Sequence, residues 1–494
     1  MKILLISPLL TPFRKPGIYN IGLGYIASVL IENGHNVEIL DIEGYRYIRT
    51  KVLSIIKKTN CDIIGIGTLI TGYRYLKWLT KEIKKIKPNV PIILGNSVGT
   101  TIPEIAINNL SIDIIVIGEG EVTILEVVDA LEQKKDLSNI QGICFKKNGQ
   151  IIRTPNRDLI KDIDTLPMPA WNLFPQEIYM NKYKNSSLEK RLPPPIGVIS
   201  TSRGCPFHCT YCYHPFQYQK VRYHSAERVI EEIKALKQNY NIKSFMFADD
   251  LSIVSAKRIF KICDLLEKEK LNLKWIVSGR VDLITEELLR KMKNAGCQVI
   301  SFGIESGSQK ILDNIKKQVT VLKAKKAILL CNKIGIYPGT SFMIGNVGET
   351  RETVLESVSF ITKYVAEPVF FFITTPYPET ELFNYAEERG LIKDKIKLFE
   401  NYGEQGSQIH VNFTEMSDEE LWALKHEAEN IILKNYFKQH PLKMISHLKG
   451  RFIGIIKGLV MEIKKNNFKK TYKKFKEKID FSNIKKIVNT FLRK

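Results

Sequence analysis

Three cysteines in one short segment are the residues of this sequence best suited to do chemistry. Cys205, Cys209 and Cys212 fall within eight residues, whereas the other five of the eight cysteines are scattered. Three thiolates on one loop can hold three irons of a cubane iron–sulfur cluster, which leaves the fourth iron open to a small chelating substrate. A structural cluster would normally use four cysteines, so the pattern predicts a reactive 4Fe–4S centre.

Two other interpretations of these cysteines stay open. A zinc ion could be held by the three thiolates together with His208 or His214, although zinc sites usually combine two separated pairs of ligands. The three cysteines could also be buried without any ligand. Eight cysteines in 494 residues are too few for a disulfide scaffold.

The segments around the cysteines predict an α/β fold. Apolar runs alternate with helical patterns over the first 135 residues, which indicates a parallel sheet covered on both faces. From residue 196 a second alternation of six units predicts a partial barrel, and from about residue 400 the pattern is helical. Ligands are expected at the carboxyl ends of both sets of strands. The expected strands are 3–6, 37–40, 63–66, 91–94, 112–117, 197–201, 244–247, 273–277, 298–303, 337–344 and 368–374.

Most of the positive charge lies at the end of the chain. Residues 434–494 hold 18 of the 74 Lys and Arg residues and 3 of the 52 Asp and Glu residues, so they carry +15 of the net +22. The net charge therefore bears on what the C-terminal tail binds more than on the chemistry of the rest of the chain. No apolar run reaches the ~18–20 residues of a membrane-spanning helix.

The cysteine spacing, with Tyr211 directly before the last cysteine and a strand before the first, resembles the motif of the radical S-adenosylmethionine (SAM) superfamily. Over nearly its whole length the chain resembles the subgroup that carries a cobalamin-binding domain. Asn346-Val347 stands where that subgroup commonly has Leu-Pro, and Glu379 where it commonly has glycine; both departures concern loop conformation. The segments that carry the resemblance are 21–27, 118–121, 164–169, 247–250, 303–307, 345–350 and 375–380.

The resemblance implies a three-part enzyme. Residues 1–135 would form a cobalamin-binding-type domain with a Rossmann-like (flavodoxin-like) parallel sheet, followed by a linker over 136–195. Residues 196–400 would form a partial TIM-type (β/α)6 radical SAM barrel. Residues 401–494 would form a helical C-terminal region with a basic amphipathic tail.

The resemblance also implies cofactors and the residues that hold them. A 4Fe–4S cluster on the three cysteines would bind the amino and carboxylate groups of SAM, and reductive cleavage of SAM would yield a 5′-deoxyadenosyl radical. Asp249 and Asp250 are expected at the SAM ammonium group, although they equally fit a helix N-cap. The other expected contacts are Arg280 for the carboxylate, Glu305 and Ser306 for the ribose or amino-acid part, and Tyr211 in the cluster loop.

Cobalamin is the third cofactor that the resemblance implies. Domains that ligate cobalt with histidine use Asp-x-His-x-x-Gly after the first strand, but residues 7–12 read Ser-Pro-Leu-Leu-Thr-Pro, and His35 stands in a turn before the second strand. We therefore expect bound cobalamin to lack a protein histidine below the cobalt. Glycines at Gly95 and 118–120 allow close backbone approach to its tail. A sheet without any ligand is the alternative, because some relatives keep the domain and lose cobalamin.

The last segment predicts a surface helix. Apolar residues from Ile445 to Ile463 recur at helical spacing, and lysines and arginines occupy much of the other face. Such helices lie on anionic membranes or bind nucleic acid, and the interleaved aromatics favour the membrane; a solvated surface helix is the third interpretation. Because the N-terminal apolar run is too short for a signal peptide, we expect a cytoplasmic protein, with peripheral contact on the inner face of the membrane.

The function that the resemblance implies is methyl transfer to an unactivated carbon, relayed through methylcobalamin. The alternative is radical carbon–carbon bond formation or cyclisation on a lipid or tetrapyrrole. RNA modification is a weaker alternative, because methylthiotransferases of that kind carry three further N-terminal cysteines, whereas this chain has only Cys61 and Cys144 before the barrel. The expected partners are a small-molecule or lipid substrate and an electron donor such as ferredoxin or flavodoxin, with no nucleic acid.

Overall fold

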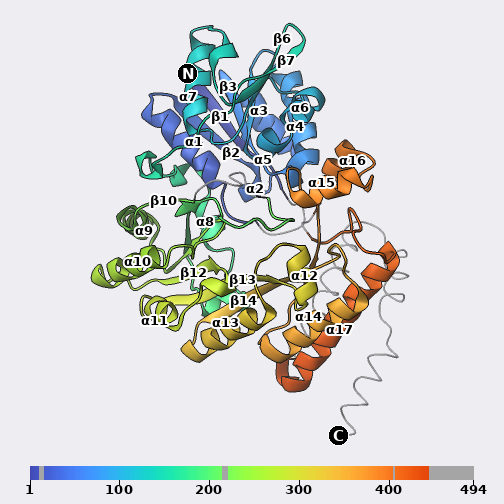
Figure 1. Ribbon diagram of the computed structural model, residues 1–494. Coiled ribbons are helices and arrows are strands. Elements are labelled where there is room, and N and C mark those ends of the chain that lie inside the picture. Colours follow the sequence, from blue (N-terminus) through green and yellow to red (C-terminus); the bar gives the residue numbers. More distant parts are fainter. Residues whose placement is uncertain (11–15, 214–220, 404–405, 444–494) are drawn as a thin grey trace, which may run out of the picture. The chain divides into compact units, whose positions relative to one another are not determined.

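The computed structural model describes residues 1–10, 16–213, 221–403 and 406–443 (Figure 1). It divides into two compact units, Met1–Glu429 and Asn430–Lys494. The predicted basic tail, with its apolar stripe, lies outside the described residues. Among the helices of the described ranges, none is both long enough and apolar enough to cross a membrane.

A seven-stranded sheet forms the first part of the chain. Its strands are β1 (Lys2–Ser7), β2 (Asn36–Asp41), β3 (Ile63–Gly67), β4 (Ile92–Gly95), β5 (Ile114–Val116), β6 (Ile143–Lys147) and β7 (Gln150–Arg153). The strand order is β2-β1-β3-β4-β5-β6-β7, and β1 to β5 pair in parallel. The order 2-1-3-4-5 is the flavodoxin-like arrangement, which confirms the predicted fold class. β6 and β7 extend the sheet as an antiparallel hairpin.

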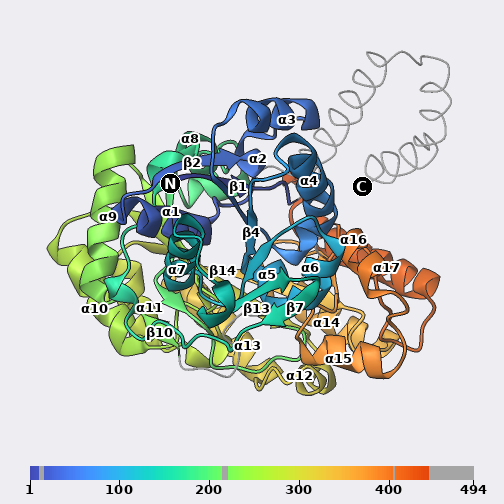
Figure 2. The ribbon, with the colours of Figure 1, turned by 90° about the horizontal axis from the view of Figure 1, so that it is seen from above.

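Helices cover both faces of this sheet, as near-continuous Ile and Val strands require. They are α1 (Ile21–Glu32), α2 (Ile42–Tyr45), α3 (Arg49–Lys58), α4 (Tyr73–Ile86), α5 (Asn96–Thr101), α6 (Pro103–Asn109) and α7 (Glu121–Glu132). α1 packs against α7, and α3 packs against α4 (Figure 2). α4 buries Leu76, Leu79 and Ile83, which recur every three or four residues and so form one apolar face.

A second sheet has six parallel strands in chain order. They are β8 (Ile196–Ile199), β11 (Ser244–Phe247), β12 (Lys274–Gly279), β13 (Cys297–Glu305), β14 (Tyr337–Ile344) and β15 (Phe371–Ile373), with β8 and β15 at the edges. Each overlaps a strand that the sequence predicts. Between β8 and β11, the short strands β9 (Ser202–Arg203) and β10 (Arg222–Tyr223) pair as an antiparallel ribbon.

The helices of this second part begin at clear sequence signals. They are α9 (Ala226–Tyr240), α10 (Ala256–Lys268), α11 (Glu286–Asn294), α12 (Gln309–Asn314), α13 (Val321–Ile334) and α14 (Arg351–Tyr364). All except α12 follow a Ser or Thr whose side chain accepts a hydrogen bond from the first turn of the helix. Such N-caps satisfy backbone donors that the helix itself leaves unpaired.

Two helices that follow the second sheet in sequence pack on the first. The chain continues with α15 (Glu381–Glu388), α16 (Lys395–Asn401) and α17 (Asp418–Gln439), while the short α8 (Gln176–Met180) lies in the linker. α16 lies beside α4 (Figure 1), with the ring of Phe399 5.9 Å from that of Tyr73. Lys77 Nζ and Glu400 Oε1, 2.5 Å apart, add an ion pair. Residues 381–402 therefore complete the core of the first part.

We expect Phe399→Ala to destabilise the protein by about 3–5 kcal/mol, because it empties a fully buried aromatic site. Phe370→Ala is the matched control, since Phe370 is 55% exposed. Urea unfolding followed by fluorescence measures both. Equal shifts of the two midpoints would contradict this account of α16.

Candidate active site

The segment before the first cysteine is held by two adjacent aspartates. Asp249 Oδ1 accepts hydrogen bonds from the backbone N–H groups of Thr201 at 2.5 Å and Ser202 at 3.0 Å, and its Oδ2 accepts from the Thr201 hydroxyl at 2.6 Å. Asp250 Oδ2 accepts from the Gly204 N–H at 3.1 Å. Gly204 has a φ of +92°, a conformation that disfavours other residues. These contacts determine where the cysteine loop begins.

The three cysteines line one cavity of about 520 Å³, which we call the cysteine cavity. None of the three forms a disulfide bond, and each is half-buried. Burial raises the pKa of Cys205, and burial with the neighbouring Cys209 and Cys205 raises that of Cys212 to about 12. In the described part of the chain, no three His, Cys, Asp or Glu side chains are grouped as ligands of one ion. Three thiols around one cavity are nevertheless a donor set that suits a multi-iron cluster.

The carboxyl ends of β11, β12, β13 and β14 supply the rest of this cavity. It brings together the cysteines, Tyr211, Asp250, Arg280 and Glu305, but Asp249 and Ser306 do not line it. The hydroxyl of Thr340, on β14, is buried without a hydrogen-bond partner among the described residues. A buried polar atom of this kind fits a site whose ligand supplies the missing bond.

Asp249 and Ser306 have partners within the protein. The Asp249 carboxylate holds the start of the cysteine loop, and α10 is capped by Ser255, so the N-cap alternative for the aspartate pair is wrong. Ser306 is fully buried, and its hydroxyl lies 3.1 Å from that of Ser357. Their contact with SAM stays a prediction.

Arg280 presents a buried positive charge at the wall of the cysteine cavity. Its guanidinium lies 3.7 Å from the centre of the Phe207 ring, inside the cysteine loop. Nη2 donates to the Gln318 carbonyl at 3.1 Å. Nε lies 2.9 Å from Asp282 Oδ1, although the two atoms are not aligned for a hydrogen bond. The charge is thus held close to the cysteines.

Lys317, which no pattern in the sequence indicated, joins two predicted residues, Glu305 and Tyr211. Its Nζ lies 3.2 Å from Glu305 Oε1 and donates to the Tyr211 hydroxyl at 3.1 Å. Burial lowers the pKa of Lys317, but Glu305 and Cys209 outweigh this and raise it above its usual value. A Cβ on Gly303 would lie 2.2 Å from Glu305 Oε1, so a larger residue there would displace the Glu305 carboxylate from this position. Lys317 follows a helix, and the rule that site residues end strands could not find it.

A second cavity, of about 450 Å³, lies at the carboxyl ends of β1, β3, β4 and β5, and we call it the glycine cavity. Its walls combine Ile, Leu and Val side chains with glycines at the strand ends and turns and with polar residues, among them Glu119, Glu121 and Asp250. A Cβ on Gly95 or Gly118 would meet nothing within 4 Å, so both glycines leave open space. No histidine is among the described residues that line it. An apolar cleft with bare backbone at this edge suits a flat macrocycle and its tail, as cobalamin requires.

The two cavities adjoin. Asp250 lines both of them, and Ser202, Arg203 and Tyr213 of the cysteine-loop region also line the glycine cavity. Groups bound in the two cavities would therefore meet near Asp250.

Comparison with known proteins agrees with this arrangement. Residues 199–361 match the radical SAM superfamily, and residues 14–128 match the B12 binding domain. An uncharacterized methyltransferase of Pyrococcus horikoshii is 37% identical over 79% of this chain and 84% of its own. The anaerobic magnesium-protoporphyrin IX monomethyl ester cyclase of Rubrivivax gelatinosus is 29% identical over 76% and 67%. The structure of the radical SAM methyltransferase TsrM from Kitasatospora setae, with cobalamin and a 4Fe–4S cluster bound, superposes with a TM-score of 0.66 at 18% identity, over 79% and 78%.

The cysteine motif, the flavodoxin-like sheet, the six-stranded parallel sheet and these matches agree with one another. The chain belongs to the radical SAM superfamily, in the subgroup that carries a B12-binding domain.

Proposed function

We propose that the protein transfers a methyl group to an unactivated carbon of a small molecule. The observation that carries the proposal is the position of Asp250 in the walls of both cavities, because the reaction needs both cofactors beside one substrate. When bound, the cluster and SAM supply a 5′-deoxyadenosyl radical, and cobalamin supplies the methyl group. The relative from Pyrococcus horikoshii, which is named a methyltransferase, supports the same reaction class.

The residues of the cysteine cavity would bind and orient SAM. Cys205, Cys209 and Cys212 hold the cluster, which leaves one iron open. Arg280 offers a guanidinium to the SAM carboxylate, and Asp250 offers a carboxylate to its ammonium group. Glu305, fixed by Lys317, accepts from the ribose hydroxyls. Asp249 and Ser306 act as positioning residues.

A test of the reaction class uses the reconstituted protein with a low-potential reductant. We expect 5′-deoxyadenosine from SAM, and transfer of a labelled SAM methyl group to the bound cobalamin. Formation of 5′-deoxyadenosine without any labelled cobalamin would favour the cyclase alternative. Failure to cleave SAM at all would overturn the proposal.

The cysteines give a direct prediction. Reconstituted protein should hold about four irons per chain, because three thiolates and one open site suit a cubane. The triple Cys205/Cys209/Cys212→Ala variant should lose this iron, whereas Cys61→Ala, a change at a buried cysteine of the first sheet's core, should keep it. Iron analysis and the absorption near 400 nm measure both, and full iron content in the triple variant would contradict the assignment.

The Glu305–Lys317 pair gives a second prediction. Gly303→Ala should weaken SAM binding to the cluster-loaded protein by roughly tenfold, or about 1.4 kcal/mol, because the new Cβ displaces Glu305. Gly17→Ala is the control, since a Cβ there meets nothing within 4 Å. Calorimetric titration measures both affinities. Equal affinities would remove Glu305 from the proposed SAM contacts.

Cobalamin in the glycine cavity should have no protein nitrogen below the cobalt. No histidine lines the described part of that cavity, and none stands in the loop directly after the first strand. The Co(II) paramagnetic resonance spectrum of the loaded protein should therefore be the same whether or not the protein is labelled with nitrogen-15, with unlabelled cobalamin in both samples. A nitrogen splitting that changes from a triplet to a doublet in the labelled protein would contradict this prediction.

Radical cyclisation is the second candidate. The Rubrivivax gelatinosus relative, a cyclase acting on a tetrapyrrole ester, aligns with 76% of this chain. Both candidates share SAM cleavage, so the fate of the labelled methyl group distinguishes them. Modification of RNA through a second cluster has weaker support: Cys61 and Cys144 are both buried in the core of the first sheet, at 7% and 0% exposure.

The cluster needs an external reductant, and we propose a low-potential carrier such as ferredoxin or flavodoxin. Peripheral contact with the inner face of the membrane stays a prediction for the basic tail, which lies outside the described residues. Flotation with anionic vesicles at low and high salt tests it.

A further inference from the structure

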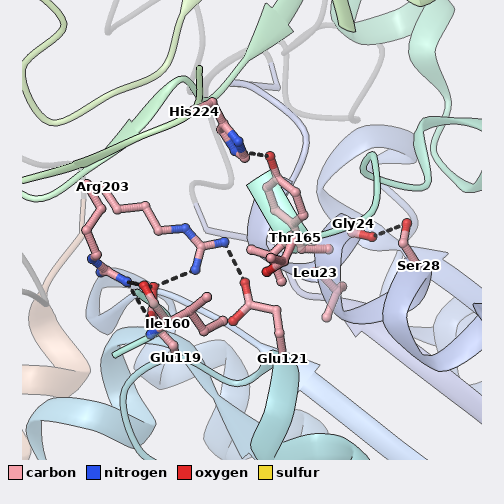
Figure 3. Close-up of polar contacts among 12 residues, drawn as sticks. Leu23, Gly24, Ser28, Glu119, Glu121, Ile160, Thr165, Arg203 and His224 are labelled. Atoms are coloured by element: carbon pink, nitrogen blue, oxygen red, sulfur yellow. Dashed lines mark hydrogen bonds and ion pairs between the residues drawn. The ribbon is translucent and has the colours of Figure 1, made fainter. Parts of the chain in front are cut away.

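Four buried charges connect the wall of the glycine cavity to the ribbon that carries the cysteine loop. Arg203 Nη1 donates to Glu119 Oε1 and its Nη2 to Glu121 Oε1, both at 2.6 Å (Figure 3). Arg222 Nη1 donates to the two Glu119 oxygens at 2.9 and 2.7 Å, and to the Ile160 carbonyl at 2.7 Å. The four charged side chains are only 4–12% exposed.

These charges join two segments that each border a proposed cofactor site. Glu119 and Glu121 line the glycine cavity, and Glu121 begins α7. Arg203 ends β9, two residues before Cys205, and Arg222 begins β10 on the other side of the cysteine loop. Both ends of the loop are therefore anchored to the wall of the other cavity.

A second set of contacts holds the same region. Tyr25 lines the glycine cavity, with the Arg203 guanidinium 5.3 Å from its ring centre. Its hydroxyl lies 3.3 Å from His224 Nε2, and His224 Nδ1 lies 2.9 Å from Asp164 Oδ1. Burial lowers the pKa of His224 to about 4, so the ring is neutral near pH 7. A neutral ring satisfies both contacts by donating from Nδ1 and accepting at Nε2.

Buried charges of this kind are a poor source of stability. Removing each ion from water costs several kcal/mol, and apolar replacements of a buried pair are often neutral or stabilising. Here two arginines balance two carboxylates. Burial raises the pKa of Glu119, but Arg222 and Arg203 outweigh it and hold the value below the ordinary one, so the carboxylate stays charged. What the pairs do provide is a defined position for the loop.

We propose that Glu119 and Glu121 are positioning residues that couple the two cavities. The identity of the two ligands rests on the proposed function. A molecule that fills the glycine cavity expels water beside these carboxylates, and their attraction for Arg203 and Arg222 grows as the local dielectric falls. Stronger pairing holds both ends of the cysteine loop in one arrangement. Cobalamin in one cavity therefore raises the affinity of the other for SAM.

The test measures binding rather than turnover. SAM is titrated into the cluster-loaded, oxidised protein with and without saturating hydroxocobalamin, where no reductant is present and no reaction occurs. We expect hydroxocobalamin to raise the SAM affinity by about fivefold or more, the lower part of the range for coupled sites. Reciprocity requires SAM to raise the hydroxocobalamin affinity by the same factor.

The variant that tests the charges keeps the buried charge balanced. Arg203→Met with Glu121→Gln removes one charge of each sign and leaves Arg222 paired with Glu119. The matched control, Arg351→Met with Glu427→Gln, removes an ion pair whose side chains are 53% and 42% exposed. The coupling is the ratio of the SAM affinities with and without hydroxocobalamin, each measured on the same variant. The buried variant should lose this ratio, whereas the control should keep it.

Three results would overturn the proposal in distinguishable ways. Full coupling in the buried double variant would show that the charges do not transmit it. If SAM and hydroxocobalamin both bind the unmodified protein but neither changes its affinity for the other, the coupling is overturned and the proposed function stays intact. Binding of SAM without any binding of hydroxocobalamin would overturn the cobalamin part of the proposed function, and the coupling with it.

Discussion

In each sheet, the strands that border a cavity run in one direction, and this common direction determines where both cavities lie. Parallel strands end at the same edge, so Asp250, Arg280 and Glu305, which end or follow three different strands, line one cavity. In the flavodoxin-like sheet, the glycine-rich ends of the parallel strands likewise line one cavity, the glycine cavity. The two edges adjoin at Asp250, and a reaction that needs two cofactors and one substrate requires such a meeting point.

The cysteine loop depends on polar contacts from outside itself, because its described residues, 204–213, form no helix or strand. Asp249, after β11, holds the backbone at its start. Glu119 and Glu121, from the other sheet, hold an arginine at each end. Burying these charges costs desolvation energy, which the pairs offset by matching charge and geometry. The position of the proposed cluster is thus specified by two segments distant from the loop in sequence, 119–121 and 249–250.

Patterns within short segments determined a large part of the fold. The strand runs of the first sheet are rich in Ile, Leu and Val, and all but one of the helices beside the second sheet follow Ser or Thr caps, so both types of element could be predicted. Cysteine spacing and family resemblance indicated the loop, and the rule that site residues end strands indicated Asp250, Arg280 and Glu305. The same rule could not separate Asp249 from Asp250, because adjacent residues on an extended chain point in opposite directions.

Only the tertiary structure decided the contacts between residues far apart in sequence. It brought Lys317 to Glu305 and Tyr211, returned α16 to the first sheet, and paired Arg203 with Glu119 and Glu121. Local periodicity reports which face of an element is apolar, but it carries no information on which distant element covers that face. Likewise, a charge in the sequence does not reveal its partner, because the pairing arises only when packing removes both groups from water.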